Sequence, residues 1–452
     1  MQVTQTVSEG LKREYRVVVP VADLDAKVNE RLADLKDRVR VNGFRPGKVP
    51  VEHLRRMYGR AVLAEAIEAA VREANTSIIA QHGFKLAMDP KVIMPETEGE
   101  MAEMMAGKTD LAYSVALEIL PKIELGDFKD IELVKLSAEV GQDEIAEAVE
   151  KIGEQNRPFV DKGEGAKAAE GDKVTVSFTG MIDGEPFEGG TADDIAVVIG
   201  SKSFIPGFEE QLVGIGGGET RTVNASFPQN YLSPNLAGKA ASFQVTAKAI
   251  EAPGKVTIDD EFAKSLGMES LAKLKDAVKD RLSRDHAEVT RRRLKRALLD
   301  ALDARYKFDL PPTLVEQEFA NVWRTLLADL EAQGKTFADE KTTEEAAREE
   351  YGKIAERRVR LGLVIAEIGE KNDIKVNEEE LTRAIVERAR QFPGQEQQIW
   401  DYYRNNPSAV ATLRAPIYEE KVVDFLLELA KVTEKTVSRQ ELYDEDDEAA
   451  AA

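Results

Sequence analysis

The chain has 452 residues, of which 42% are hydrophobic and 32% are charged, and its formal net charge is −21. This length predicts two to four domains, and the absence of cysteine excludes disulfides, cysteine-bound metals and thiol catalysis. The strong negative charge argues against a binder of free nucleic acid, because affinity for phosphates requires clustered cations.

Neither a targeting segment nor a membrane span is indicated. The N-terminal residues contain no apolar h-region, and no run of about 18 apolar residues occurs anywhere in the chain. The three histidines, His53, His82 and His286, lie in unlike contexts, which disfavours a histidine-based metal site. We therefore expect a cytoplasmic protein with no cofactor, no metal and no membrane partner.

Residues 1–115 are predicted to form an α+β domain, beginning with a strand at residues 14–19. Apolar residues three or four apart then predict a helix with one apolar face, namely Leu24, Val28, Leu32, Leu35 and Val39. A helix-stop pattern at residues 41–43 ends it. The same spacing predicts a second helix at Leu63, Ile67, Val71 and Ile78. Strands at residues 86–93 and 111–120 complete the domain.

Residues 116–169 are predicted to be a linker that holds a short strand at residues 131–136 and a helix at residues 143–155. Over residues 170–250 the pattern changes to short strands separated by turn residues. The stretches VTVSF and SFQVTAKAI alternate with period two, and Asp183-Gly184 is a hairpin signal. This region is therefore predicted to be a small, mostly antiparallel β domain, and the whole chain an α+β multidomain protein.

Residues 251–435 are predicted to be all-α. Two segments, at residues 308–314 and 373–379, share an extended stretch followed by a capped helix and are candidates for paired arms. Long, charged and modestly apolar helices can frame a groove that binds many unfolded segments weakly. Several large apolar residues of this all-α region could equally be client contacts or core residues: Met268, Trp323, Phe392, Trp400 and Tyr403. The acidic tail, residues 436–452, is predicted to be disordered.

A basic patch interrupts this acidic chain. Residues 38–60 hold seven lysines and arginines against a single acidic residue, Glu52. Within the patch, the octet GFRPGKVP at residues 43–50 sets a phenylalanine beside an arginine on a loop that two glycines and two prolines keep irregular and stiff. Such a tip presents an apolar anchor with a cationic flank.

This octet resembles the G-F-R-x-G-x-x-P signature of the trigger factor family. The resemblance implies that the loop docks on a protein at the rim of the ribosomal exit tunnel. The implied ribosome-binding residues are Gly43, Phe44, Arg45, Pro46, Gly47 and Lys48. Pro46 stands where relatives are often basic, which removes one charge from the contact. The other interpretation of the octet is a solvated glycine–proline turn.

The β domain carries a pattern suited to proline isomerisation. Rotation about an X-Pro bond faces a barrier of about 18–20 kcal/mol, and an apolar pocket with one hydrogen-bond donor can lower it by favouring the twisted amide. Residues 174–245 resemble the FKBP-type isomerases in several separate motifs, including VTVSFTG, FIPGFE and LAGK. No nucleophile motif is needed for such chemistry.

The resemblance implies a pocket made of eight residues: Phe178, Phe187, Glu188, Phe204, Ile205, Phe208, Tyr231 and Phe243. It also implies that the backbone N–H of Ile205 binds the substrate carbonyl and that the Tyr231 hydroxyl is a second polar contact. Phe178, Glu188 and Phe208 replace the usual Tyr, Asp and Trp. Alternatively, these aromatic residues only fill a small β core.

Three functions fit these observations. The first is a chaperone that docks on the ribosome near the exit tunnel, binds nascent and unfolded polypeptides, isomerises prolyl bonds, and can form a homodimer away from the ribosome. The second is a stand-alone isomerase that does not dock on the ribosome. The third is a holdase whose β domain has lost its activity.

Overall fold

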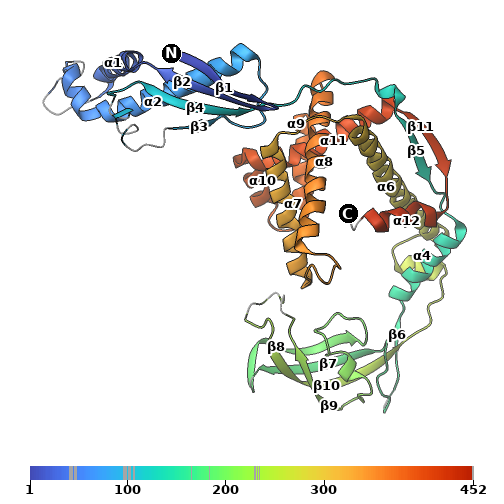
Figure 1. Cartoon of the computed structure of the whole chain (residues 1–452). Coiled ribbons are helices and arrows are strands. Elements are labelled where there is room, and N and C mark those ends of the chain that lie inside the picture. Colours follow the sequence, from blue (N-terminus) through green and yellow to red (C-terminus); the bar gives the residue numbers. More distant parts are fainter. Residues whose placement is uncertain are drawn as a thin grey trace. The chain divides into compact units, whose positions relative to one another are not determined.

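The computed structural model describes residues 1–39, 44, 48–94, 99, 103–104, 107–163, 165–182, 184–228, 231, 233 and 235–449. The chain forms two compact units, each built from two stretches of sequence (Figure 1). One unit comprises Met1–Leu133 and Lys295–Val432, and the other comprises Val134–Leu294 and Thr433–Ala452. Within the described part of the chain, none of the helices combines the length and apolar character that crossing a membrane requires.

The N-terminal part of the first unit is a four-stranded antiparallel sheet together with the long helices α1 (Val21–Arg38) and α2 (Val51–His82), as far as the structure describes it. The sheet has the order β1-β2-β4-β3, and its strands are β1 (Gln2–Glu9), β2 (Lys12–Val19), β3 (Lys91–Ile93) and β4 (Leu111–Glu118). The predicted strands at residues 14–19 and 111–120 are confirmed. The predicted strand at residues 86–93 shrinks to β3 and a single bridge at Leu86, because Pro90 has no amide hydrogen for the ladder.

Two helices, α1 (Val21–Arg38) and α2 (Val51–His82), accompany this sheet. The buried face of α2 changes along its length. Near its start, Leu54 and Val62 pack with Val28 and Leu32 of α1. Further along, the helix packs against the sheet through Ile67, Ala70, Ala74 and Ile78. Because α1 ends at Arg38 and α2 begins at Val51, the octet at residues 43–50 lies in the sequence between the ends of two packed helices.

The β domain belongs to the second unit and consists of a five-stranded antiparallel sheet. Its strands are β6 (Phe159–Asp161), β7 (Lys173–Ile182), β8 (Glu185–Val198), β9 (Thr220–Ser226) and β10 (Ala240–Pro253). Strand β10 pairs with β6, β7 and β9, and β7 also pairs with β8. Strand β6 lies in the predicted linker and joins the sheet only through residues 251–253 of β10.

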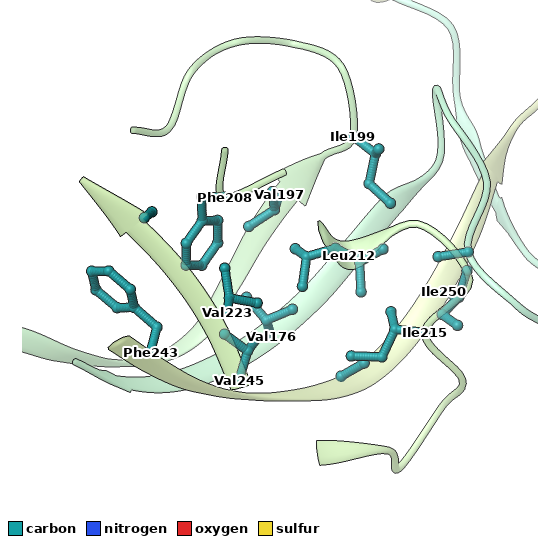
Figure 2. Packing of buried hydrophobic residues seen from close by; sticks show 14 of the residues in the cluster. Val176, Val197, Ile199, Phe208, Leu212, Ile215, Val223, Phe243, Val245 and Ile250 are labelled. Atoms are coloured by element: carbon teal, nitrogen blue, oxygen red, sulfur yellow. The ribbon is translucent and has the colours of Figure 1, made fainter. Parts of the chain in front are cut away.

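The core of the β domain consists mainly of packed aliphatic side chains together with phenylalanines (Figure 2). Phe208 and Phe243 lie at one end of this core, and Ile250 lies at the other. The short 3-10 helix η2 (Glu210–Leu212) contributes Leu212, which is fully buried. The apolar alternation of β7 and β10 therefore builds one face that is packed and ends in aromatic side chains.

Three helices extend the second unit beyond the β domain. They are α4 (Gln142–Gln155), α5 (Asp260–Ser265) and the first part of α6 (Leu271–Arg305), and they share a core that includes Ile145, Phe262 and Leu274. The predicted helix at residues 143–155 is confirmed. The chain between the β domain and the N-terminal domain thus contains packed structure as well as connecting segments, while the exact domain boundaries stay predictions.

The C-terminal tail differs from the disordered segment predicted over residues 436–452. Strand β11 (Lys431–Thr436) pairs with β5 (Glu132–Ser137), and helix α12 (Arg439–Ala449) follows. Leu442 of α12 is fully buried and packs with Val289 of α6. The prediction of disorder was wrong because it rested on the acidic composition. Two apolar residues within the acidic segment, Val437 and Leu442, are buried and hold it against α6.

The rest of the first unit is helical, as predicted. It contains the 3-10 helix η1 (Phe128–Asp130) and α7 (Pro312–Gln333), α8 (Glu344–Lys371), α9 (Glu378–Arg390), α10 (Glu396–Asn405) and α11 (Pro407–Leu429). Both candidate arm segments lead into helices: α7 carries a proline in its first turn, and α9 has a full capping box between Asn377 and Glu380.

Candidate functional site

An aromatic cavity of about 650 Å³ opens in the β domain. All the predicted pocket residues whose side chains the structure describes line it: Phe178, Phe187, Phe204, Ile205, Phe208, Tyr231 and Phe243. They come from β7, β8 and β10, from the segment between β8 and η2, and from the segment after β9. The predicted Glu188 side chain lies outside the described part of the structure. The sheet thus brings together residues that are spread over more than sixty positions of the sequence.

Phe208 forms the floor of the cavity and is only 1% exposed. Its ring stacks on Phe204 with centroids 5.3 Å apart and meets the ring of Phe243 edge-on at the same distance. Phe178 packs edge-on against both Phe208 and Phe243, at 5.8 and 5.9 Å. Edge-to-face packing fixes each ring by its neighbours, so the cavity is preformed and suited to a flat apolar group the size of a proline ring.

Phe227 is a wall residue that the sequence analysis did not single out. Its ring lies 4.7 Å from Tyr231 and 5.9 Å from Phe187, measured between centroids. Tyr231 itself is 37% exposed, which leaves its hydroxyl at the rim. Phe227 follows the last residue of β9, in the Phe-Pro pair four residues before Tyr231. Its position directly after a strand of alternating pattern was the feature of the sequence that could have identified it as a pocket residue.

The backbone beside the floor offers a free donor. The N–H of Ile205 has no acceptor among the described residues, although Ile205 lines the cavity. The carbonyl of Ile205, in contrast, accepts the N–H of Phe208 at 3.1 Å. A mainly aromatic cavity with an unpaired amide at its edge can hold a proline ring and donate to a carbonyl next to it.

Glu209 lies behind this donor and is only 5% exposed. Burial raises the pKa of its carboxyl, but hydrogen bonds from the backbone N–H groups of Phe204, Lys202 and Ser203, and from the hydroxyl of Ser201, outweigh that effect and lower the pKa. The carboxylate therefore stays ionised at neutral pH inside the segment that carries Phe204 and Ile205.

The predicted docking loop is described only at Phe44 and Lys48. Gly43, Arg45, Pro46 and Gly47 lie outside the described residues. Phe44 is 39% exposed, and its ring centroid lies 5.2 Å from that of His53 in the first turn of α2. Lys48 is exposed, while Val49 beside it is fully buried. Phe44 thus presents an exposed ring, and Val49 packs in the core beneath α1 and α2.

No cluster of three or more His, Asp or Glu residues that could hold a metal ion occurs in the described ranges.

The aromatic cavity in a five-stranded antiparallel sheet defines an FKBP-type isomerase domain, here within a larger protein that also has an α+β domain and a helical body. A family model described as "FKBP-type peptidyl-prolyl cis-trans isomerase" matches residues 164–248. Models described as "Bacterial trigger factor protein (TF)" and "Bacterial trigger factor protein (TF) C-terminus" match residues 1–152 and 270–428. The chain belongs to the trigger factor family.

Curated relatives agree over the full length. "Trigger factor" of Azorhizobium caulinodans is 63% identical over 451 residues, with 100% of both chains covered. "Trigger factor" of Rhodopseudomonas palustris strain HaA2 is 60% identical over 452 residues, again with 100% of both chains covered. The predicted family, the chaperone function and the peptidyl-prolyl isomerase activity are thereby confirmed.

A solved structure supports the fold. It is described as "Promiscuous Substrate Recognition in Folding and Assembly Activities of the Trigger Factor Chaperone", and it covers 95% of this chain and 99% of its own. The TM-score is 0.56 at 20% sequence identity. At this identity the match confirms the predicted multidomain fold class.

Proposed function

We propose that the aromatic cavity is where this chaperone isomerises prolyl bonds. The proline ring of an unfolded chain enters between Phe178, Phe208 and Phe243, and the N–H of Ile205 donates to the carbonyl beside it as the amide twists. The observation that carries this proposal is the unpaired Ile205 amide at the edge of a mainly aromatic cavity. Donation to the twisted amide stabilises the transition state more than the planar ground state.

Substitution at the floor tests this assignment. Phe208→Ala, or Phe204→Ala, in the full chain should lower kcat/KM for a Leu-Pro peptide by at least about tenfold, because the walls then no longer hold the proline ring. Val213→Ala is the matched control, since Val213 is an exposed apolar residue of the same domain. Unchanged turnover in folded Phe208→Ala protein would refute the assignment.

We also propose that Phe44, Arg45 and Lys48 anchor the protein to the ribosome near the exit tunnel, and that Gly43, Pro46 and Gly47 shape the loop. The proposal is supported by the exposed ring of Phe44 and by the basic patch in a chain of net charge −21. Opposite charges steer association with an acidic ribosomal surface, and the apolar ring adds burial on contact. This function places the protein in the cytoplasm.

Ribosome co-sedimentation tests the docking proposal. Phe44→Ala together with Arg45→Ala should abolish co-sedimentation and leave isomerisation of short peptides intact. Val3→Ala together with Arg16→Ala is the control, because it also removes one side chain that is 39% exposed and one exposed arginine from the same domain. Undiminished co-sedimentation of the first variant would refute the role of this loop in docking. Absence of co-sedimentation in the wild type would favour a stand-alone isomerase.

Exposed aromatic residues of the helical body are candidates for client contacts. Phe392, which follows α9, and Tyr402 of α10 are both exposed, whereas Trp323 is buried between α7 and α8. Met268, Trp400 and Tyr403 are half-buried. We therefore assign Phe392 and Tyr402 to client binding and Trp323 to the core. A homodimer away from the ribosome stays a prediction.

A further inference from the structure

The segment between β8 and η2 shapes one wall of the cavity without regular secondary structure. It contains two glycines at positive φ, Gly200 and Gly207, and Lys202 also adopts a positive φ of 57°. The amides of such a segment have no neighbouring strand to donate to, and buried amides need acceptors. The conformation of this wall therefore depends on whatever accepts them.

The Glu209 carboxylate accepts four of these amides. Its Oε2 accepts the N–H groups of Gly200 and Lys202, both at 2.9 Å. Its Oε1 accepts those of Ser203 at 2.8 Å and Phe204 at 3.0 Å. Successive backbone amides that converge on one anion form a nest, and here the anion is a side chain of the same segment.

The series of bound amides ends one residue before the free donor. Glu209 holds the N–H of Phe204, and the N–H of Phe208 holds the carbonyl of Ile205 at 3.1 Å. These two hydrogen bonds fix the peptide planes on either side of the plane that carries the Ile205 N–H. Because each peptide unit is planar, little freedom remains for that N–H to turn away from the cavity.

We infer that Glu209 is a positioning residue for proline isomerisation: it holds the segment from Gly200 to Phe204 so that the Ile205 N–H points at the substrate carbonyl. Glu209 does not touch the substrate in this arrangement. The inference rests on the proposed role of the Ile205 N–H.

Only an ionised carboxylate supplies this pattern of acceptors. In Glu209→Gln, one of the two oxygens becomes an NH₂ group, which is a donor and would face two amide donors. The glutamine side chain therefore keeps the size of glutamate but can accept only two of the four amide hydrogen bonds. Glu209→Asp keeps the charge but withdraws it by one methylene group. Glu210→Gln is the control for charge, because Glu210 is an exposed neighbour.

The test measures kcat and KM of the full chain on a Leu-Pro tetrapeptide, together with the amide resonance of Ile205. Glu209→Gln should lower kcat by about tenfold or more, as loss of a preorganised donor does, with KM changed less because the aromatic cavity remains. In the wild type, adding peptide should shift the Ile205 amide resonance, and in Glu209→Gln this shift should vanish. Glu210→Gln should behave as the wild type.

Folded Glu209→Gln protein with kcat within twofold of the wild type, or with an unchanged Ile205 shift, overturns the inference. If Glu209→Gln does not fold, Glu209→Asp carries the same two measurements and should show a smaller loss of kcat. Phe208→Ala distinguishes failure of this inference from failure of the proposed function. Full activity of Phe208→Ala means that catalysis lies elsewhere. Loss of activity in Phe208→Ala together with wild-type activity in Glu209→Gln refutes only the positioning role.

Discussion

At the scale of single residues, the position of Phe187 depends on two glycines. A Cβ added at Gly180 would lie 2.8 Å from the Phe187 ring and 2.7 Å from the Phe243 ring, and a Cβ at Gly190 would lie 2.9 Å from Phe187. Carbon atoms do not approach so closely, so any side chain at either position must displace a pocket wall. Glycine is required here for space.

Gly180→Ala should therefore destabilise the isomerase domain and reduce its activity. Overpacking of this kind costs about 1–3 kcal/mol of the free energy of unfolding, and the displaced Phe187 narrows the cavity. Urea unfolding and peptide isomerisation measure the two effects. Gly217→Ala is the control, because no heavy atom beyond its own chain neighbours is found within 4 Å of the added methyl group. Equal effects of both variants would contradict the steric argument.

The acid sensitivity of the cavity wall follows from Glu209. Because the pKa of this carboxyl is lower in the folded protein than its ordinary 4.5, its contribution to stability is complete above that pH and is lost as the pH falls through the lowered pKa. The difference in free energy of unfolding between the wild type and Glu209→Gln should accordingly shrink as the solution is acidified from neutrality. A difference that grows in acid would contradict this sign.

At the scale of elements, α6 and α12 show how a short helix gains its position. Arg293 of α6 donates from its guanidinium to the carbonyls of Glu441 and Leu442, at 2.7 and 2.9 Å, and Leu442 fills a site beside Val289. An eleven-residue helix with this much acidic sequence is marginal alone. Its order therefore comes from this docking.

Leu442→Ala should release α12 from α6. Truncation of a buried leucine costs about 2–5 kcal/mol of stability. The short helix is only marginally stable by itself, so it cannot offset this loss. Limited proteolysis should then cleave the chain near residue 439 faster than in the wild type. Asp444→Ala, at an exposed position of the same helix, should leave the cleavage rate unchanged. Slow cleavage of Leu442→Ala would show that the remaining contacts of the segment, including those of Arg293, Val437 and Tyr443, are enough to hold the helix.

At the scale of the whole molecule, the proposed sites of isomerisation and client holding are different surfaces. The cavity belongs to the isomerase domain, whereas the exposed aromatic residues Phe392 and Tyr402 belong to the helical body. Neither surface shares a residue with the other or with the docking loop. The activities should therefore be separable by substitution.

Phe208→Ala should lose isomerase activity and still suppress aggregation of an unfolded protein that contains no proline, at the same molar ratio as the wild type. Phe392→Ala together with Tyr402→Ala should show the opposite pattern, because weak apolar contacts with clients are lost while the cavity is intact. Light scattering during refolding measures aggregation. Loss of holding in Phe208→Ala would mean that the isomerase cavity also serves as the chaperone surface.

Local patterns in the sequence determined the types of element and the identity of the cavity. Period-two alternation located β7 and β10, helical spacing located α1 and α2, and the aromatic motifs named seven residues that do line one cavity. These features depend on residues that lie close together in the chain, so a sequence displays them directly.

Only the tertiary structure decided which distant segments meet. The pairing of β6 with β10, the burial of Leu442 against α6, and the convergence of four amides on Glu209 leave no periodic trace in the sequence. A three-residue strand, one leucine in an acidic run and one glutamate among many are each unremarkable locally. Their roles arise because packing and unsatisfied hydrogen bonds select a partner from the whole folded chain, and that selection is a property of three-dimensional proximity.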